Sequence, residues 1–140
     1  MFNIPFHLHL VGASLIFLAM AHIDFCKRFH WQEELVRLSL LNRQIFYVHS
    51  FFICLVLVQM GLLCLLAPTA LLEHSLLGRY VAVGFAAFWL IRLYSQWFVY
   101  DWRLWRGKYF ETSMHAIFTL LWTYYVLVFA EVAWKQFYGA

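Results

Sequence analysis

The stretch IFYVHSFFICLVLVQMGLLCLLA, residues 45–67, contains no Asp, Glu, Lys or Arg and is followed directly by Pro68. An α-helix needs roughly 20 apolar residues to cross about 30 Å of hydrocarbon, so this stretch predicts a transmembrane helix. Three further apolar runs of similar length occur at residues 6–25, 76–100 and 115–134. The sequence therefore predicts an all-α integral membrane protein, a bundle of four transmembrane helices. We place the helices at about residues 5–25, 44–67, 76–100 and 112–134.

The composition supports this fold class. The chain is 65% hydrophobic and 12% charged, with a mean hydropathy of +0.74, which lies outside the range of soluble globular domains. The shorter segments of alternating polarity that a β-barrel needs are absent. We expect one domain over residues 1–140. Between the first two helices, Leu35, Leu38 and Leu41 recur at helical spacing among charged residues, which predicts a short amphipathic helix lying in the membrane interface.

The basic residues predict an orientation. Seven of the ten lie in the connections that follow the first and third helices: Lys27, Arg28, Arg37, Arg43, Arg103, Arg106 and Lys108. The opposite side has only Arg79 and Lys135. The positive-inside rule then places these connections in the cytoplasm and both termini outside, and we expect the bacterial inner membrane. Lipid head groups account for the net charge of +3, so no nucleic-acid partner is needed.

Three ionisable side chains each lie several residues inside a different predicted helix: His49, Arg92 and His115. Ionisable groups in hydrocarbon are costly, so they usually face a bundle interior and mark a functional site. Four helices of alternating direction would bring all three to the cytoplasmic half, with His49 about 10 Å deep. Arg92 shares a helix face with Gln96, and His115 shares one with Glu111.

A haem b site is the leading hypothesis for this cluster. His49 and His115 would be the axial ligands, with His22 as a substitute, and Arg92 or Arg43 would pair with the propionates. The protein would then exchange electrons with quinone. The hypothesis also rests on an analogy with small four-helix membrane cytochromes rather than on a shared motif.

Two alternatives use the same residues differently. In the first, His49, His115, His22 and Glu111 bind a divalent metal in a small membrane enzyme that acts on a lipid-soluble substrate, although no catalytic residue can be assigned. In the second, the chain is a structural or assembly subunit of a larger membrane complex or homo-oligomer, and the polar cluster serves helix packing. Arg92 could form an ion pair with Asp24, Asp101 or Glu111, or recognise a quinone carbonyl or a lipid phosphate.

Overall fold

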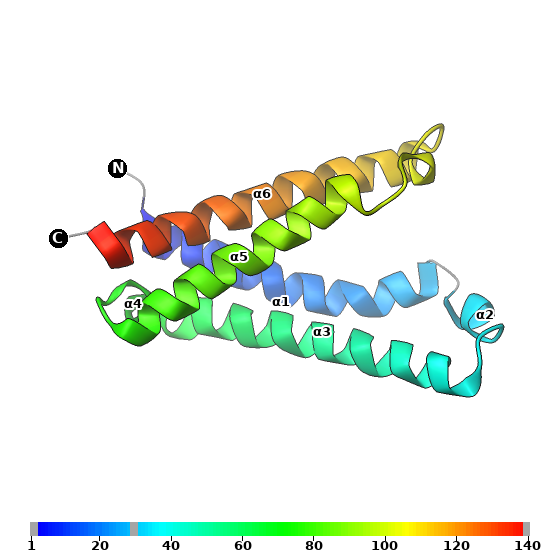
Figure 1. Cartoon of the computed structure of the whole chain (residues 1–140), viewed down its shortest axis with the longest axis horizontal. Coiled ribbons are helices and arrows are strands. Elements are labelled where there is room, and N and C mark those ends of the chain that lie inside the picture. The colour runs from blue at the N-terminus through cyan, green and yellow to red at the C-terminus, as the bar shows by residue number, and fades with distance from the viewer. Residues whose placement is uncertain (1–2, 29–30, 139–140) are drawn as a thin grey trace. The chain divides into compact units, whose positions relative to one another are not determined.

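The computed structural model describes residues 3–28 and 31–138, which are helical almost throughout and contain no strand (Figure 1). The elements in chain order are α1 (Ile4–Arg28), α2 (Trp31–Leu35), α3 (Leu40–Leu66), α4 (Pro68–Leu72), α5 (Leu76–Phe98), the 3₁₀-helix η1 (Trp102–Leu104) and α6 (Tyr109–Tyr138). In this described part, α1, α3, α5 and α6 are long and apolar enough to cross a membrane. The all-helical prediction with four candidate transmembrane helices is confirmed.

The helix ends follow from local chemistry. α3 begins several residues before the predicted position because Ser39 caps it, accepting a hydrogen bond from the backbone N–H of Asn42 at 3.4 Å. α3 ends ahead of Pro68, which opens the five-residue α4, a position where proline's missing N–H costs nothing. Ser75 caps α5 in the same way, accepting from the N–H of Gly78 at 2.9 Å.

The short helix predicted between the first two long helices is present as α2, but it spans only five residues. Leu35 is buried and α2 packs against α1, whereas Glu33 and Glu34 are exposed. Leu38 and Leu41, which we expected on the same amphipathic face, lie beyond the end of α2 and are exposed. The amphipathic pattern therefore continues past the point where this helix stops.

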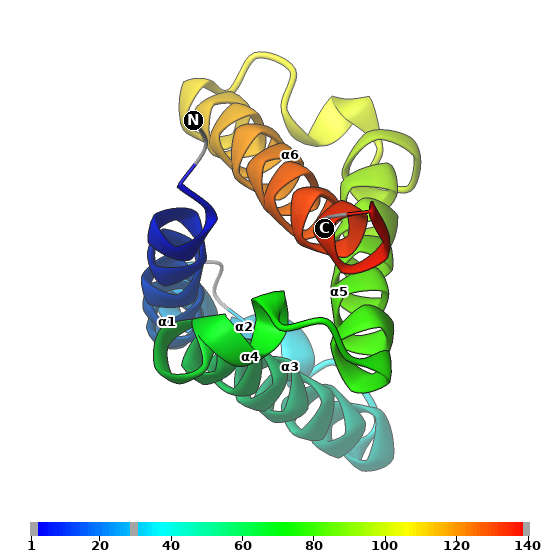
Figure 2. The ribbon, with the colours of Figure 1, turned by 90° about the vertical axis from the view of Figure 1, so that its left-hand side faces the viewer.

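The chain divides into two compact units, each organised around one pair of long helices (Figure 2). Unit 1 comprises Asn3–Pro68 and pairs α1 with α3. Unit 2 comprises the described residues from 69 onward and pairs α5 with α6. Each unit has its own core.

The core of unit 1 depends on two glycines. A Cβ atom added to Gly12 would lie 2.8 Å from the carbonyl oxygen of Gly61, and one added to Gly61 would lie 2.9 Å from Ile16 Cδ1. Both distances are too short for a real Cβ contact, so α1 and α3 approach backbone to backbone, as small residues allow in membrane helices.

The core of unit 2 is an aromatic seam with a seven-residue period. On α5 the buried residues include Ala82, Trp89 and Gln96, and on α6 they include Trp122, Phe129 and Gln136. A seven-residue repeat keeps one stripe of each helix facing its partner, as in a left-handed helix pair. Trp89 stacks on Trp122 with ring centroids 5.0 Å apart, an aromatic contact that adds to the burial of both rings.

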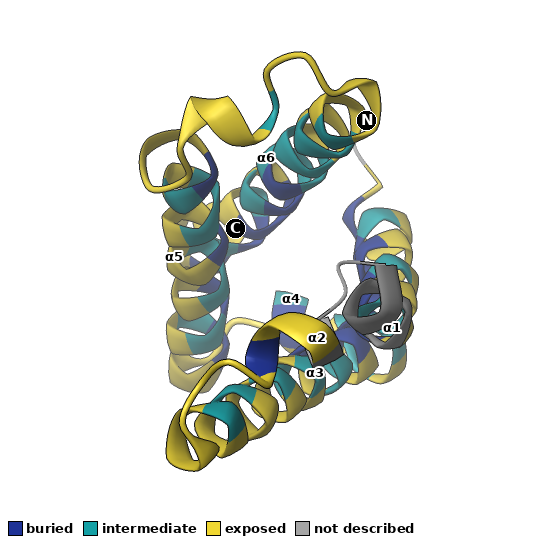
Figure 3. Ribbon diagram, turned by 90° about the vertical axis from the view of Figure 1, so that its right-hand side faces the viewer, coloured by how far each residue is buried: buried dark blue, intermediate teal, exposed yellow. Residues whose placement is uncertain are grey.

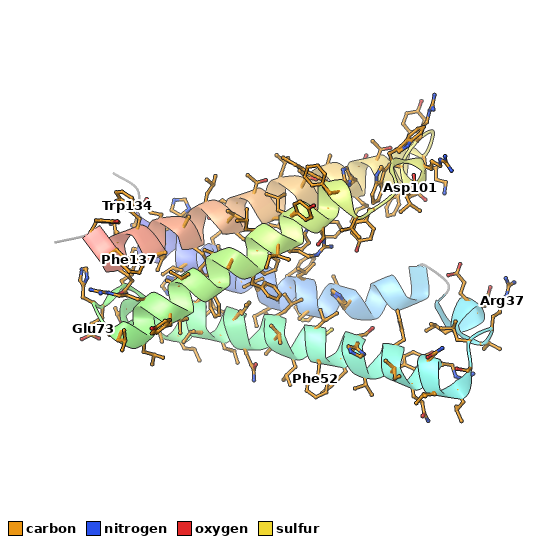
Figure 4. All side chains as sticks on the ribbon, in the orientation of Figure 1. Arg37, Phe52, Glu73, Asp101, Trp134 and Phe137 are labelled. Carbon is orange, nitrogen blue, oxygen red and sulfur yellow. The ribbon has the colours of Figure 1, made fainter. Side chains whose placement is uncertain are left out.

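Gln136 closes one end of this seam. Its side chain is fully buried, and its amide nitrogen donates to the carbonyl oxygens of Leu71 and Glu73, each at 2.7 Å. Its amide oxygen accepts from the N–H of Ser75 at 3.4 Å. These bonds fasten the turn that precedes α5 to the end of α6. Figure 4 labels Glu73 at this end of unit 2 and Asp101 at the other.

Candidate functional site

The predicted site residues are divided between the two units. His22, Arg43 and His49 belong to unit 1, on α1 and α3. Arg92, Glu111 and His115 belong to unit 2, on α5 and α6. The haem and metal ligand sets combine residues from both units and stay predictions. The contacts inside unit 2, however, define a site by themselves.

Arg92, Gln96 and His115 form one chain of hydrogen bonds between α5 and α6. Arg92 Nη1 donates to Gln96 Oε1 at 3.2 Å, and Gln96 Nε2 lies 2.7 Å from His115 Nδ1. Arg92 and Gln96 are one helical turn apart and share a face, as the sequence predicted. Gln96 is 4% exposed, so it bridges the other two residues inside the seam.

This chain of hydrogen bonds determines whether each of its three side chains donates or accepts. A guanidinium only donates, so the atom of Gln96 that faces Arg92 has to be its oxygen. The amide nitrogen then faces His115 and donates to Nδ1. Turning the amide over would place two donors against each other at Arg92. His115 therefore accepts at Nδ1, and its ring carries a proton on Nε2.

Aromatic rings surround this chain. The guanidinium carbon of Arg92 lies 5.0 Å from the ring centroid of Trp122 and 5.7 Å from that of Tyr100, within the range of cation–π contacts. The His115 ring stacks on Trp105 with centroids 4.3 Å apart. Trp105 comes from the connection between α5 and α6, so that connection lies against the site.

The ion pairs considered for Arg92 within unit 2 are absent from the described residues. Asp101 accepts instead from the backbone N–H of Arg103 at 2.9 Å and so caps η1. Glu111 lies half-buried in the first turn of α6, where a negative charge suits the helix dipole. The cation of Arg92 is thus held by an amide and two aromatic rings rather than by a carboxylate.

Three further buried polar atoms of α5 and α6 lack partners among the described residues. They are Nε1 of Trp89, Nε1 of Trp122 and Oγ1 of Thr119, all buried. The indole N–H groups can only donate. Trp122 lies directly beside Arg92, and Trp89 stacks on Trp122. Buried polar groups are normally paired, so each unpaired one needs an explanation.

The donors left over define the chemistry of the site. Gln96 Oε1 already accepts from Arg92, and His115 Nδ1 already accepts from Gln96. What remains is His115 Nε2–H, the other guanidinium N–H groups, two indole N–H groups and one hydroxyl. We call Arg92, His115, Trp89, Trp122 and Thr119 the donor cluster. With the exception of the hydroxyl, its spare groups can only donate hydrogen bonds.

His49 shows the opposite arrangement. Its Nδ1 lies 2.8 Å from the carbonyl oxygen of Ile45, which can only accept, so the ring proton is on Nδ1 and Nε2 carries a lone pair. His22 makes the same type of contact with the Leu18 carbonyl at 3.2 Å. Among the side chains of residues 3–22 and 33–138, no three from His, Cys, Asp or Glu lie close enough together to hold a metal ion.

Sequence reasoning found the two ends of the hydrogen-bond chain but missed its centre. We placed Gln96 on the same helix face as Arg92 but assigned it no role. An uncharged amide is less conspicuous in an apolar helix than an ionisable side chain is. Its recurrence in the seven-residue pattern of Ala82 and Trp89 is the signal that could have placed it in the seam. Gln136 was missed for the same reason.

Comparison of the chain with known protein families, with curated proteins and with solved structures finds no match. The chemistry of the donor cluster therefore has to carry the functional argument.

Proposed function

We propose that the protein is a membrane-embedded binding protein for a lipid-soluble redox cofactor of the quinone class, and that the donor cluster in unit 2 holds the cofactor's carbonyl oxygen. The observation that supports this most is the Arg92–Gln96–His115 chain, in which each side-chain acceptor already receives a hydrogen bond while several donors remain. A site with spare donors binds a ligand that brings acceptors.

The energetic argument concerns burial. A buried donor without a partner costs about 1–3 kcal/mol, and a charged one costs more. A carbonyl oxygen placed between Arg92 and His115 would offset part of this cost with a charge-assisted hydrogen bond of about 1.5–3 kcal/mol. The indole N–H groups of Trp89 and Trp122 are unpaired among the described residues and fully buried, so an acceptor reaches them only when neighbouring side chains move.

The quinone class fits the surroundings of the donors. A quinone has a flat ring, carbonyl acceptors and an apolar tail, and it dissolves in the bilayer core. The rings of Trp122, Tyr100 and Trp105 lie beside Arg92 and His115 and match a flat partner. The distribution of basic residues supports a site in the cytoplasmic leaflet with both termini outside, and we place the protein in a bacterial inner membrane.

Equilibrium binding of a short-tailed ubiquinone to the full chain in phosphatidylcholine nanodiscs tests the proposal. Arg92→Gln and His115→Leu should each weaken binding about tenfold or more, the equivalent of one charge-assisted hydrogen bond. Arg79→Gln is the matched control, since it removes an arginine from the other end of α5, where Arg79 donates to the Gln136 carbonyl at 3.0 Å.

Two outcomes would contradict the proposal: no binding above protein-free nanodiscs, or equal losses in Arg79→Gln and Arg92→Gln. The oxidation state of the ligand sharpens the test. A quinone carbonyl only accepts, whereas the hydroxyl of a quinol also needs an acceptor, so the oxidised form should bind more tightly. Competition by an anionic phospholipid would show that a lipid phosphate is the natural acceptor.

Haem b is a second candidate, supported by His49. An axial histidine binds iron through Nε2 while its Nδ1–H donates to a protein acceptor, which is the arrangement of His49 with Ile45. His115, the other ligand of this hypothesis, would have to change tautomer and lose its bond from Gln96. A visible spectrum of the purified protein, oxidised and reduced, tests this candidate. A Soret band that disappears in His49→Ala supports it, and a featureless spectrum from protein kept with its native lipids rejects it.

A further inference from the structure

The connection between α5 and α6 carries three cations and one acid. Arg103, Arg106 and Lys108 are all exposed, and the carboxylate of Asp101 is engaged in capping η1 through the N–H of Arg103. We call residues 99–108 the η1 loop. It joins two helices that are long and apolar enough to span a membrane, so it lies where such helices leave the hydrocarbon and meet lipid head groups.

The η1 loop also exposes large apolar side chains. Trp102 is 56% exposed and Leu104 is 48% exposed, and almost the whole loop is coloured as exposed in Figure 3. The guanidinium carbon of Arg106 lies 4.9 Å from the ring centroid of Trp102. Aromatic rings that alternate with long basic side chains suit the boundary between hydrocarbon and head groups, where the rings enter the apolar layer and the cations meet phosphates.

The η1 loop is held in place rather than left as a free chain. The hydroxyl of Thr112 lies 2.8 Å from the carbonyl oxygens of both Trp105 and Lys108 and shares its one proton between them. Gly107 has a φ of 77°, which favours glycine and allows the tight turn into α6. Trp105 faces inward onto His115. A fixed backbone presents the three cations together at one place, which lowers the entropy lost when they bind a shared anionic surface.

We propose that the η1 loop is a binding site for the head groups of anionic phospholipids. Each cation close to an anionic membrane surface favours binding by about fivefold. The connection between α3 and α5, by contrast, contains no Lys or Arg. The proposal is independent of the donor cluster, because its cations point outward from the loop and belong to other residues.

The test measures lipid preference at the surface of the full chain. The protein is reconstituted in phosphatidylcholine vesicles that contain either spin-labelled phosphatidylglycerol or spin-labelled phosphatidylcholine. Electron spin resonance then gives the motionally restricted fraction of each lipid. The wild type should retain phosphatidylglycerol in preference, and Arg103→Gln with Arg106→Gln should remove most of that preference. Arg37→Gln with Arg43→Gln removes the same charge from the connection between α1 and α3 and should reduce the preference much less.

Several results would overturn the proposal. One is a wild type without preference for phosphatidylglycerol. Another is an equal loss in the Arg37 and Arg43 variant, which would make net charge rather than the η1 loop responsible. If the loop variant fails to fold, a measurement on the wild type alone still tests the proposal. Its preference should fall as the salt concentration rises, and a preference that salt leaves unchanged would also count against binding by cations.

Discussion

Gln96 on α5 and Gln136 on α6 lie at opposite ends of one helix–helix seam, and each uses its amide in the same way. The nitrogen of each amide donates across to another segment, Gln96 to His115 and Gln136 to the turn at Leu71 and Glu73. The oxygen of each accepts one bond, from Arg92 and from Ser75. Two neutral amides thus connect the segments of unit 2, and the aromatic core of the seam lies between these two amides.

The tautomer of His115 should depend on Gln96. In the wild type Nδ1 accepts from the amide and should carry no proton. Gln96→Glu replaces the donor with a carboxylate that only accepts, so a proton should move to Nδ1. Nitrogen NMR of histidine-labelled protein, assigned with His115→Leu, measures this directly. His49 provides the internal control, because its Nδ1 should be protonated in both proteins. A protonated Nδ1 at His115 in the wild type would contradict the hydrogen-bond chain.

The Trp122→Phe variant separates ligand binding from packing. The indole N–H of Trp122 has no partner among the described residues, so its removal breaks no hydrogen bond in the protein. We expect the free energy of unfolding to fall by roughly 1–3 kcal/mol, because the smaller phenylalanine leaves a cavity beside Trp89. Quinone affinity should fall several-fold, because one potential donor is lost. Parallel measurements of quinone binding and of unfolding test both expectations. An unchanged quinone affinity would show that Trp122 does not belong to the donor cluster.

The Gly61→Ala variant should destabilise unit 1. The added Cβ would lie 2.9 Å from Ile16 and 3.0 Å from the Gly12 carbonyl oxygen, so the two helices have to separate. We expect a loss of about 1–3 kcal/mol in the free energy of unfolding, measured by titration from mild detergent into SDS. Gly84→Ala is the matched control. A Cβ there meets no atom within 4 Å, and alanine's higher helix propensity should stabilise the protein by up to about 1 kcal/mol.

The Gln136→Leu variant should loosen the end of unit 2. Leucine cannot donate, so the carbonyl oxygens of Leu71 and Glu73 lose their bonds from the amide. The expected cost is about 2 kcal/mol or more, since each buried group left unpaired costs about 1–3 kcal/mol. Hydrogen exchange at the Ser75 amide should become faster. Gln59→Leu, at an exposed position of α3, should change stability by less than about 0.5 kcal/mol.

The sequence was sufficient to predict the long helices, because the hydrophobicity of successive residues adds up along each helix. Some twenty apolar residues in a row outweigh any single exception, so one histidine in residues 45–67 did not obscure a helix. The boundaries depended on single side chains instead. Ser39 starts α3 earlier than the hydrophobic pattern suggests, and α6 continues to Tyr138, past Trp134, where the apolar run stops. A single capping residue, or one more helical turn, changes a hydropathy pattern very little.

The candidate site was predictable only in part. Charge made Arg92 and His115 conspicuous, because few ionisable residues lie inside apolar helices. The direction in which each side chain donates was not predictable, because it depends on the orientation of one amide, that of Gln96. Depth along a helix can be counted in residues, but the tautomer of a histidine depends on a partner from another helix. That partner is visible only once the two helices are packed.

The close approach of Gly12 and Gly61 has a consequence for biosynthesis. The two glycines belong to the first and second candidate membrane helices, and their helices form one compact unit that ends at Pro68. Translation proceeds from the N-terminus, so α1 and α3 are both complete before most of unit 2 has been made. Their hairpin can therefore close while α5 is still being synthesised. The protein would then fold in two steps, one helical hairpin at a time.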